Sequence, residues 1–216
     1  MSKVVNSNKV KDNLACGQTI MIGGFLEVGA PDNLIDIVHK EGITNLTLVA
    51  NDTGFPDKKI GSLIVENRVK KVIASHVGTN SETGRQMNEE EIEVELVPQG
   101  TLAERIRCQG AGLGGILTPT GVGTVVEEGK DKIEVDGEEY LLEKPIKADI
   151  ALLKAWKADE KGNLIYRYAA RNFNPLMAMA ADMVIVEAEE IVPAGELDAN
   201  QIMTPGIFVD YVVDFD

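Results

Sequence analysis

The sequence predicts an α/β protein in which a mostly parallel β-sheet is flanked by helices. Over the first two thirds of the chain, short apolar runs alternate with segments whose apolar residues recur at helical spacing, a pattern typical of such a sheet. Buried-strand patterns return near residues 150 and 185. An Asp-Gly pair between two strand-like runs predicts a β-hairpin insertion near residues 131–142. No repeat or linker interrupts this order, so we expect a single domain over residues 1–216.

The composition restricts the classes of partner. The chain has 216 residues and a formal net charge of −14 at pH 7. An acidic surface repels nucleic acids and anionic membranes, so we expect neither, whereas a small anionic ligand needs only a local positive pocket. Two cysteines cannot form a zinc cluster, and we expect no metal site. The polar N-terminal residues and the lack of a long apolar run lead us to expect a cytoplasmic protein.

The first elements follow from local patterns. A buried strand is expected at residues 18–22 and a helix at residues 31–40. Pro31 suits the first helical position and Gly42 can cap the end. The apolar face of this helix would consist of Leu34, Ile35, Ile37 and Val38. Further strands are expected at residues 45–50, 71–75 and 93–97, followed by a helix at residues 101–108.

The pattern changes after residue 109. Residues 110–123 are rich in glycine and predict a loop without an element of its own. The Asn174-Pro175 pair predicts the cap and the first position of a short helix. The acidic run at residues 187–190 predicts a solvated edge or, alternatively, a surface that faces a partner. The remaining buried strands are expected at residues 150–153 and 183–186.

Residues 23–31 (GGFLEVGAP) lie between a predicted strand and a predicted helix. Ligands of α/β sheets bind at such places, because glycines let the backbone approach a ligand and a helix N-terminus offers free N–H groups to an anion. The segment lacks the GxGxxG spacing, and Ala30-Pro31 replaces the Lys-Ser/Thr of a phosphate loop. We therefore expect neither a nicotinamide dinucleotide nor a nucleoside triphosphate. A tight turn without a ligand explains the pattern equally well.

Gln99 stands where a second predicted strand gives way to a helix, within residues 97–101 (VPQGT). A side-chain amide at this place can donate a hydrogen bond to a developing oxyanion. Taken by itself, the pattern favours a helix cap or a side chain that faces solvent.

Five motifs, in order along nearly the whole chain, resemble those of the family I coenzyme A (CoA) transferases. They are GGF-x-x-x-G-x-P at 23–31, NDTG at 51–54, PQGT at 98–101, LTPTGVGT at 117–124 and ARNFN at 170–174. The chain is most similar to the A (alpha) subunits of bacterial short-chain acyl-CoA:acetate and acetoacetate transferases. One position departs from the family pattern: Cys16 precedes Gly17, where the family usually has Asp or Asn before the glycine. This position lies at the start of a strand and not in the pocket. The resemblance implies the ribose-phosphate isomerase and CoA-transferase architecture (NagB/RpiA/CoA-transferase-like).

The resemblance also implies an activity and a partner. Family members exchange CoA between short-chain carboxylic acids in ping-pong fashion, through a glutamyl-CoA thioester. The nucleophilic glutamate belongs to the beta subunit, in a Ser-Glu-Asn-Gly motif that this chain lacks. We interpret its nearest string, residues 81–84, as a helix start with Ser81 as the cap and Glu82 in the first turn. We therefore expect an α2β2 assembly with a beta subunit, CoA thioesters as substrates and no cofactor.

The site residues are assigned by the same resemblance. Gln99 matches the glutamine whose amide faces the reacting carbonyl, and Asn51 matches a pocket asparagine. The segment expected to bind CoA and substrate comprises Gly23, Gly24, Phe25, Leu26, Glu27, Val28 and Gly29. Because the motif leaves the position of Glu27 variable, we expect its side chain to be dispensable. Loss of turnover in a Glu27→Gln variant of the assembled enzyme would contradict this.

Two other functions fit the sequence less well. An isomerase or deaminase acting on a sugar phosphate is suggested by fold analogy alone, and it would need an acid/base pair within this chain, where none stands out. A non-catalytic acyl-CoA sensor would keep the pocket without turnover. An adjacent reading frame with the Ser-Glu-Asn-Gly motif would favour the enzyme, and its absence would favour the sensor.

Overall fold

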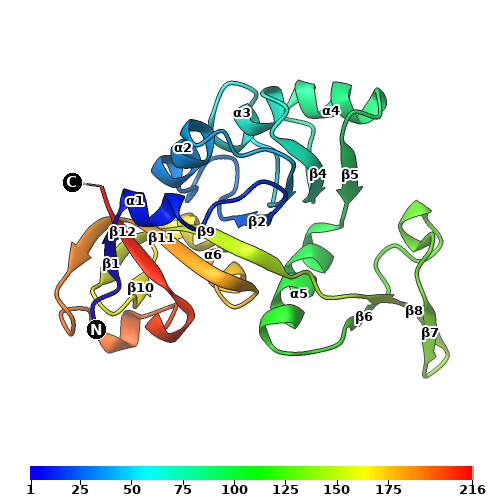
Figure 1. The fold of residues 1–216 in the computed structure, drawn as a ribbon. Coiled ribbons are helices and arrows are strands. Elements are labelled where there is room, and N and C mark those ends of the chain that lie inside the picture. Colours follow the sequence, from blue (N-terminus) through cyan, green and yellow to red (C-terminus); the bar gives the residue numbers. More distant parts are fainter. Residues whose placement is uncertain (216) are drawn as a thin grey trace.

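The computed structural model describes residues 1–215, which form one large sheet, one small sheet and the helices around them (Figure 1). Within these residues the large sheet has nine strands and is mostly parallel. The predicted fold class is thereby confirmed. In spatial order the strands are β1 (Val4–Asn6), β12 (Tyr211–Asp214), β11 (Ala181–Val192), β9 (Ala148–Asp159), β2 (Thr19–Ile22), β3 (Leu46–Val49), β4 (Val69–Ala74) and β5 (Glu93–Leu96), with β10 (Leu164–Ile165) antiparallel to β9.

Helices cover both faces of this sheet, as Figure 1 shows for α2, α3 and α4 on one side and α5 on the other. The α-helices are α1 (Ser7–Lys11), α2 (Asp32–Lys40), α3 (Lys59–Val65), α4 (Ser81–Asn88), α5 (Gln99–Gly110) and α6 (Asn174–Met177). Short 3-10 helices occur at η1 (Val125–Glu127), η2 (Tyr168–Arg171), η3 (Ala199–Gln201) and η4 (Gly206–Phe208).

Alternating side chains of the central strands supply two apolar cores. In β2, Ile20 and Ile22 point toward α1, α2 and α3, whereas Met21 points toward α5 and α6. A strand segment buried on both faces needs apolar residues at every position, which explains the apolar run at residues 20–22 of β2. The predicted apolar face of α2 is confirmed, because Leu34, Ile35, Ile37 and Val38 are all buried.

The small sheet contains the predicted hairpin. Strands β7 (Lys132–Val135) and β8 (Glu138–Glu143) pair antiparallel around Asp136-Gly137, with both turn residues at positive φ. The prediction of a loop without any element at 110–123 is wrong, because β6 (Ile116–Thr118) pairs with β8 as a third strand. Three residues between glycines carry too weak a local pattern, and the partner that makes them a strand lies about 25 residues away in the chain. This sheet projects beyond α5 from the main body (Figure 1).

Several predicted helix ends differ from the structure. Pro31 is the N-cap of α2 rather than its first residue, a shift of one position. The cap of α4 is Asn80, whose side-chain oxygen accepts from the backbone N–H groups of Glu82 and Thr83 at 3.1 and 3.4 Å, so Ser81 is not the cap. Asn174 is the first residue of α6 and not its cap, because its side chain is used elsewhere.

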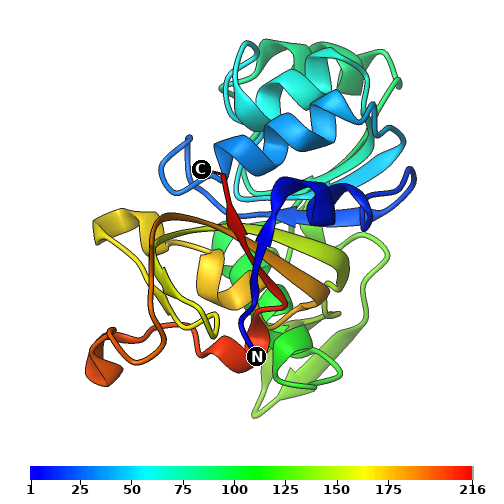
Figure 2. The same ribbon diagram turned by 60° about the vertical axis from the view of Figure 1, so that its left-hand side comes forward.

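The sequence patterns missed α3, β10 and the pair β1 and β12. Strands β1 and β12 are short and lie side by side in parallel at one end of the large sheet, although they come from opposite ends of the chain (Figure 2). A local window contains neither strand's partner, which is why periodicity did not find them.

Candidate functional site

The strand order has a switch point beside β2. From β2 the chain adds β3, β4 and β5 on one side, whereas β9, β11 and β12 lie on the other. In open parallel sheets, ligands bind in the crevice outside the carboxyl ends of the strands at this point. The predicted site segments 23–29, Asn51 and Gln99 directly follow, or lie within three residues of, the carboxyl ends of β2, β3 and β5.

The loop after β2 contains a tight two-residue turn, and we call residues 23–29 the glycine turn. Phe25 and Val28 exchange backbone hydrogen bonds of 3.0 Å in both directions. The central residues Leu26 and Glu27 have φ values of 43° and 74°, which a type I′ turn requires and which residues with a side chain adopt at a cost of about 1–3 kcal/mol each. Such strain persists only where neighbours hold it in place.

Two side chains hold the strained turn. The carboxylate oxygen Oδ2 of Asp52 accepts from the Leu26 N–H at 2.9 Å. The ammonium group of Lys59 donates to the Glu27 carbonyl at 3.1 Å and pairs with Asp32 at 3.1 Å. The backbone of the turn is therefore fixed from the loop after β3 and from the start of α3.

Asparagines of the 170–174 motif surround the same turn. Asn172 accepts from the Gly24 N–H at 3.1 Å and donates to the Val28 carbonyl at 3.0 Å. Asn174 donates to the Gly29 carbonyl at 3.2 Å and accepts from the Lys154 N–H at 3.2 Å. A Cβ at Gly23 would lie 2.0 Å from Asn174 Oδ1, so this glycine is required by close approach.

Gln99 and Asn51, which the sequence placed in one site, are in direct contact. The Gln99 amide Nε2 donates to Asn51 Oδ1 at 2.9 Å, and Asn51 Nδ2 donates to Asp52 Oδ2 at 2.8 Å. This is the carboxylate oxygen that also holds Leu26. The Gln99–Asn51–Asp52 network thus joins the predicted oxyanion donor to the glycine turn. Sequence reasoning missed Asp52, although it lies inside the quoted NDTG motif.

Open space flanks both parts of the site. A cavity of about 290 Å³ lies beside Val28 and Gly29 and is lined further by Lys154, Trp156 and Arg167. The Arg167 guanidinium stands 4.3 Å from the centroid of the Trp156 ring and forms no ion pair within residues 1–215. A second cavity of about 360 Å³ adjoins the start of α5 and β6.

The N-terminus of α2 does not offer the free N–H groups that the sequence led us to expect. Glu187 Oε2 accepts from the Asn33 and Leu34 N–H groups at 2.7 and 3.3 Å. Burial raises the pKa of this carboxyl, and the Lys154 ammonium, 3.4 Å away, opposes the shift. Glu187 is only 4% exposed, so the prediction of a solvated edge is wrong at this residue, and α2 is already capped by an anion of the chain itself.

Comparisons with known proteins agree with this geometry. The model of the family described as Coenzyme A transferase matches residues 6–214.

The chain belongs to the coenzyme A transferase family.

Relatives within this family are similar over nearly their full length. The chain is 57% identical to the acetate CoA-transferase subunit alpha of Escherichia coli K12, over 91% of this chain and 90% of that protein. It is 51% identical to the acetoacetyl-CoA:acetate/butyrate CoA transferase alpha subunit of Clostridium acetobutylicum, over 98% and 97%. The resemblance found in the sequence motifs is confirmed.

Solved structures share the fold. An acyl-CoA transferase of Escherichia coli O157:H7, in a thioester complex with CoA, superposes with a TM-score of 0.87 at 22% identity. The match covers 98% of this chain and 49% of that one, so this CoA-transferase chain spans about half of that protein. Glutaconate CoA-transferase from Acidaminococcus fermentans has a TM-score of 0.86 at 21% identity, over 98% of this chain and 75% of that one.

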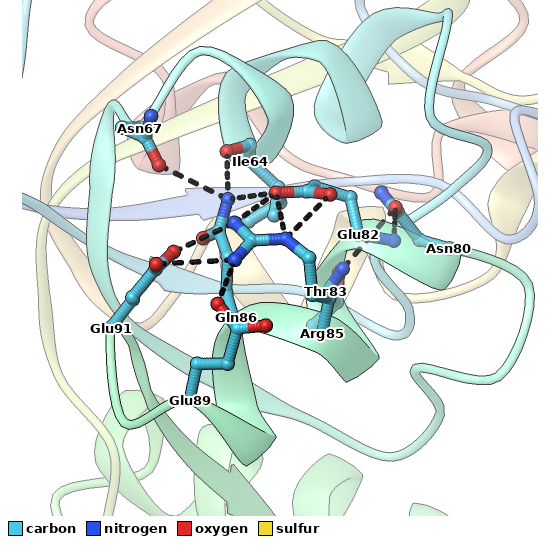
Figure 3. Close-up of polar contacts among 9 residues, drawn as sticks. All are labelled: Ile64, Asn67, Asn80, Glu82, Thr83, Arg85, Gln86, Glu89 and Glu91. Atoms are coloured by element: carbon cyan, nitrogen blue, oxygen red, sulfur yellow. Dashed lines mark hydrogen bonds and ion pairs between the residues drawn. The ribbon is translucent and has the colours of Figure 1, made fainter.

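Glu82, in the string nearest to the family's nucleophile motif, is held by neighbouring side chains (Figure 3). Arg85 donates to its carboxylate at 2.6 to 3.1 Å and also binds Glu89 and Glu91. Gln86 donates to it at 2.9 Å. These hydrogen bonds, that of Arg85 first, lower the pKa of Glu82 to about 2. The interpretation of a polar helix start fits this CoA-transferase chain better than a nucleophile does.

Residues 1–215 contain no cluster of three or more His, Cys, Asp or Glu side chains that could hold a metal ion. In the same residues no helix is long and apolar enough to cross a membrane. The expectations of a cytoplasmic location and of a single domain over residues 1–216 stay predictions.

Proposed function

We propose that this chain is the alpha subunit of a short-chain acyl-CoA:carboxylate CoA-transferase of the acetate, butyrate or acetoacetate class. It acts with a beta subunit, in an α2β2 assembly in the cytoplasm. The names of the relatives at 57% and 51% identity support the substrate class and the alpha role. The observation that carries the proposal is the Gln99–Asn51–Asp52 network, because it places a side-chain amide donor beside the glycine turn at the switch point of the sheet.

The proposed reaction is a ping-pong exchange. A glutamate carboxylate of the beta subunit attacks the thioester carbonyl, and the CoA thiolate leaves as an acyl-glutamyl anhydride forms. The thiolate attacks the glutamyl carbonyl of the anhydride, which releases the first carboxylate and leaves a glutamyl-CoA thioester. The second carboxylate then takes the CoA by the reverse sequence. Each attack creates an oxyanion, and Gln99 Nε2–H donates to it. CoA thioesters are substrates, and no cofactor takes part.

Two carboxylates of this chain near the site, those of Asp52 and Glu187, already have other roles. Asp52 accepts three hydrogen bonds, from Leu26, Asn51 and Gly54. Glu187 caps α2. Neither is free to attack a thioester, which supports a nucleophile on the partner subunit.

The net charge of −14 disfavours the approach of the phosphates of CoA to most of the surface. Arg167, which lies on Trp156 beside the glycine turn, is one group that can approach them. We propose that most cationic contacts come from the beta subunit and that the glycine turn contributes backbone groups.

CoA transfer from acetoacetyl-CoA to acetate tests the proposal. It should be measured with this chain alone, with the candidate beta subunit alone and with the mixture, using butyrate as a second acceptor. We expect activity only in the mixture, and size analysis of the active species should give α2β2. Activity of this chain alone would place the nucleophile here and overturn the shared-site proposal. A mixture that binds acyl-CoA without transfer to either acid would indicate a sensor.

The Glu27 side chain is expected to be unnecessary for turnover in the assembled enzyme. Its Oε1 is buried and accepts no hydrogen bond from residues 1–215, so a Glu27→Gln change removes a charge without removing a hydrogen bond at that atom. Steady-state kinetics should give a kcat close to that of the wild type, because the turn acts through its backbone. A kcat reduced by orders of magnitude, in a complex that still assembles, would make Glu27 a catalytic group.

A further inference from the structure

We propose that Asp52 is a positioning residue, which sets the orientation of the Gln99 amide through Asn51. The inference rests on the proposed function, since it assigns the work of holding the oxyanion donor to a residue that does not touch the substrate. Three contacts carry it: Gln99 Nε2 to Asn51 Oδ1 at 2.9 Å, Asn51 Nδ2 to Asp52 Oδ2 at 2.8 Å, and Leu26 N to the same Oδ2 at 2.9 Å.

A side-chain amide can be placed in two orientations that exchange its oxygen and its nitrogen. An ionised carboxylate only accepts hydrogen bonds, so Asn51 must turn its Nδ2 toward Asp52. Asn51 Oδ1 then faces Gln99 and can only accept, so Gln99 must turn its Nε2 toward Asn51. The carboxylate thereby decides the orientation of two amides in series.

This chain of contacts fixes the direction of the Gln99 amide donor at the surface of the crevice. Nε2 of Gln99 carries two protons, and one is used by Asn51. Within residues 1–215 the second proton has no partner, so it is available to an oxygen of the substrate. The Ser75 hydroxyl lies 2.8 Å from the Asn51 carbonyl and 3.3 Å from its Oδ1, and a donor there favours the same orientation of Asn51.

Burial makes the arrangement rigid. Asn51 and Asp52 are 2% and 4% exposed, whereas Gln99 is exposed. Water therefore has little access to replace a missing partner of Asn51, and a buried polar group that loses its partner is costly. Without Asp52, Asn51 Nδ2 has no acceptor, and only the longer contact of 3.3 Å from the Ser75 hydroxyl still favours this orientation of Asn51. A fraction of the Gln99 amides would then present oxygen where the reaction needs N–H.

Asp52 also holds the glycine turn, so a simple loss of activity would not separate the two roles. A double-mutant cycle in the assembled enzyme does separate them. The variants are Asp52→Ala, Asp52→Asn, Gln99→Ala and the double variants. Asp57→Ala is the control, because Asp57 lies in the same loop and is exposed. Thermal unfolding and assembly with the beta subunit are measured for each variant.

We expect Asp52→Ala to lower kcat by about tenfold or more. The loss should not exceed the hundred- to thousandfold reduction that is typical of removing the donor itself. The double variant with Gln99→Ala should lose less than the two single losses combined, because Asp52 has no donor left to orient and only its hold on the glycine turn is still lost. Asp52→Asn should keep more activity than Asp52→Ala, since its single amide oxygen can still accept from Asn51 in place of Oδ2, although the hydrogen bond from Gly54 is then lost. Asp57→Ala should match the wild type.

Additive losses in the cycle, or an Asp52→Ala effect confined to KM, would overturn the inference while leaving the proposed function intact. Absence of transfer by the wild-type complex would instead refute the proposed function. If Asp52→Ala does not assemble, the cycle with Asp52→Asn decides, because that variant keeps the size of the side chain.

Discussion

Replacing Gln99 by alanine should lower kcat for CoA transfer about a hundred- to a thousandfold, the usual cost of removing one oxyanion donor. The side chain lies at the start of α5, where its amide is held by Asn51 and keeps a second N–H free for substrate. An interaction made only in the transition state changes kcat without weakening substrate binding to the same extent. Steady-state kinetics of the assembled enzyme, with acetoacetyl-CoA and acetate, measure both.

Gln109→Ala is the matched control, because Gln109 lies near the other end of α5 and has no hydrogen bond from its side chain within residues 1–215. It should leave kcat unchanged. A Gln99→Glu variant should lose about as much as Gln99→Ala, since a carboxylate facing Asn51 Oδ1 brings two acceptors together. A Gln99→Ala enzyme with wild-type kcat would show that the oxyanion is stabilised by other groups.

Gly61→Ala should destabilise the protein by about 1–3 kcal/mol or more, the cost of adding a methylene-sized group to a packed interior. Gly61 is buried in α3, and a Cβ there would lie 1.8 Å from the carbonyl oxygen of Phe55 and 3.0 Å from Asn80 Nδ2. The oxygen belongs to the backbone and cannot rotate away. The loop that follows Asp52 must therefore move, and we expect CoA transfer to fall together with the melting temperature.

Gly84→Ala provides the comparison, because Gly84 lies in α4 and a Cβ there meets nothing within 4 Å. Alanine is preferred over glycine inside a helix by about 0.5–1 kcal/mol, so this variant should melt slightly higher than the wild type. Thermal unfolding of the two variants in parallel tests the argument. Equal melting temperatures of the two variants would mean that the loop that follows Asp52 moves aside without a loss of stability.

Elements that depend on neighbouring residues in the chain could be predicted from the sequence. The apolar spacing of 31–40 predicted α2, and Asp136-Gly137 predicted the hairpin turn, because both depend on residues that are neighbours in the chain. The glycine, Asn51 and Gln99 motifs were placed at strand ends, which in a parallel sheet meet at one edge. Their mutual proximity could be anticipated, and the contact between Gln99 and Asn51 agrees with it.

The side chains that hold this edge of the sheet together could not be predicted, because their partners are distant in the chain. Asp52 binds a backbone group 26 residues away, and Asn172 binds one that is 148 residues away. Glu187 caps α2 through a backbone N–H group that lies 154 residues before it in the chain. The local sequence predicts a helix cap at Asn174, because an asparagine at the start of a helix usually has that role. It predicts a solvated side chain at Glu187, because acidic runs usually face solvent. Their partners exist only once the sheet brings β2, β9 and β11 side by side, and a buried polar group then takes the donor or acceptor that the fold supplies.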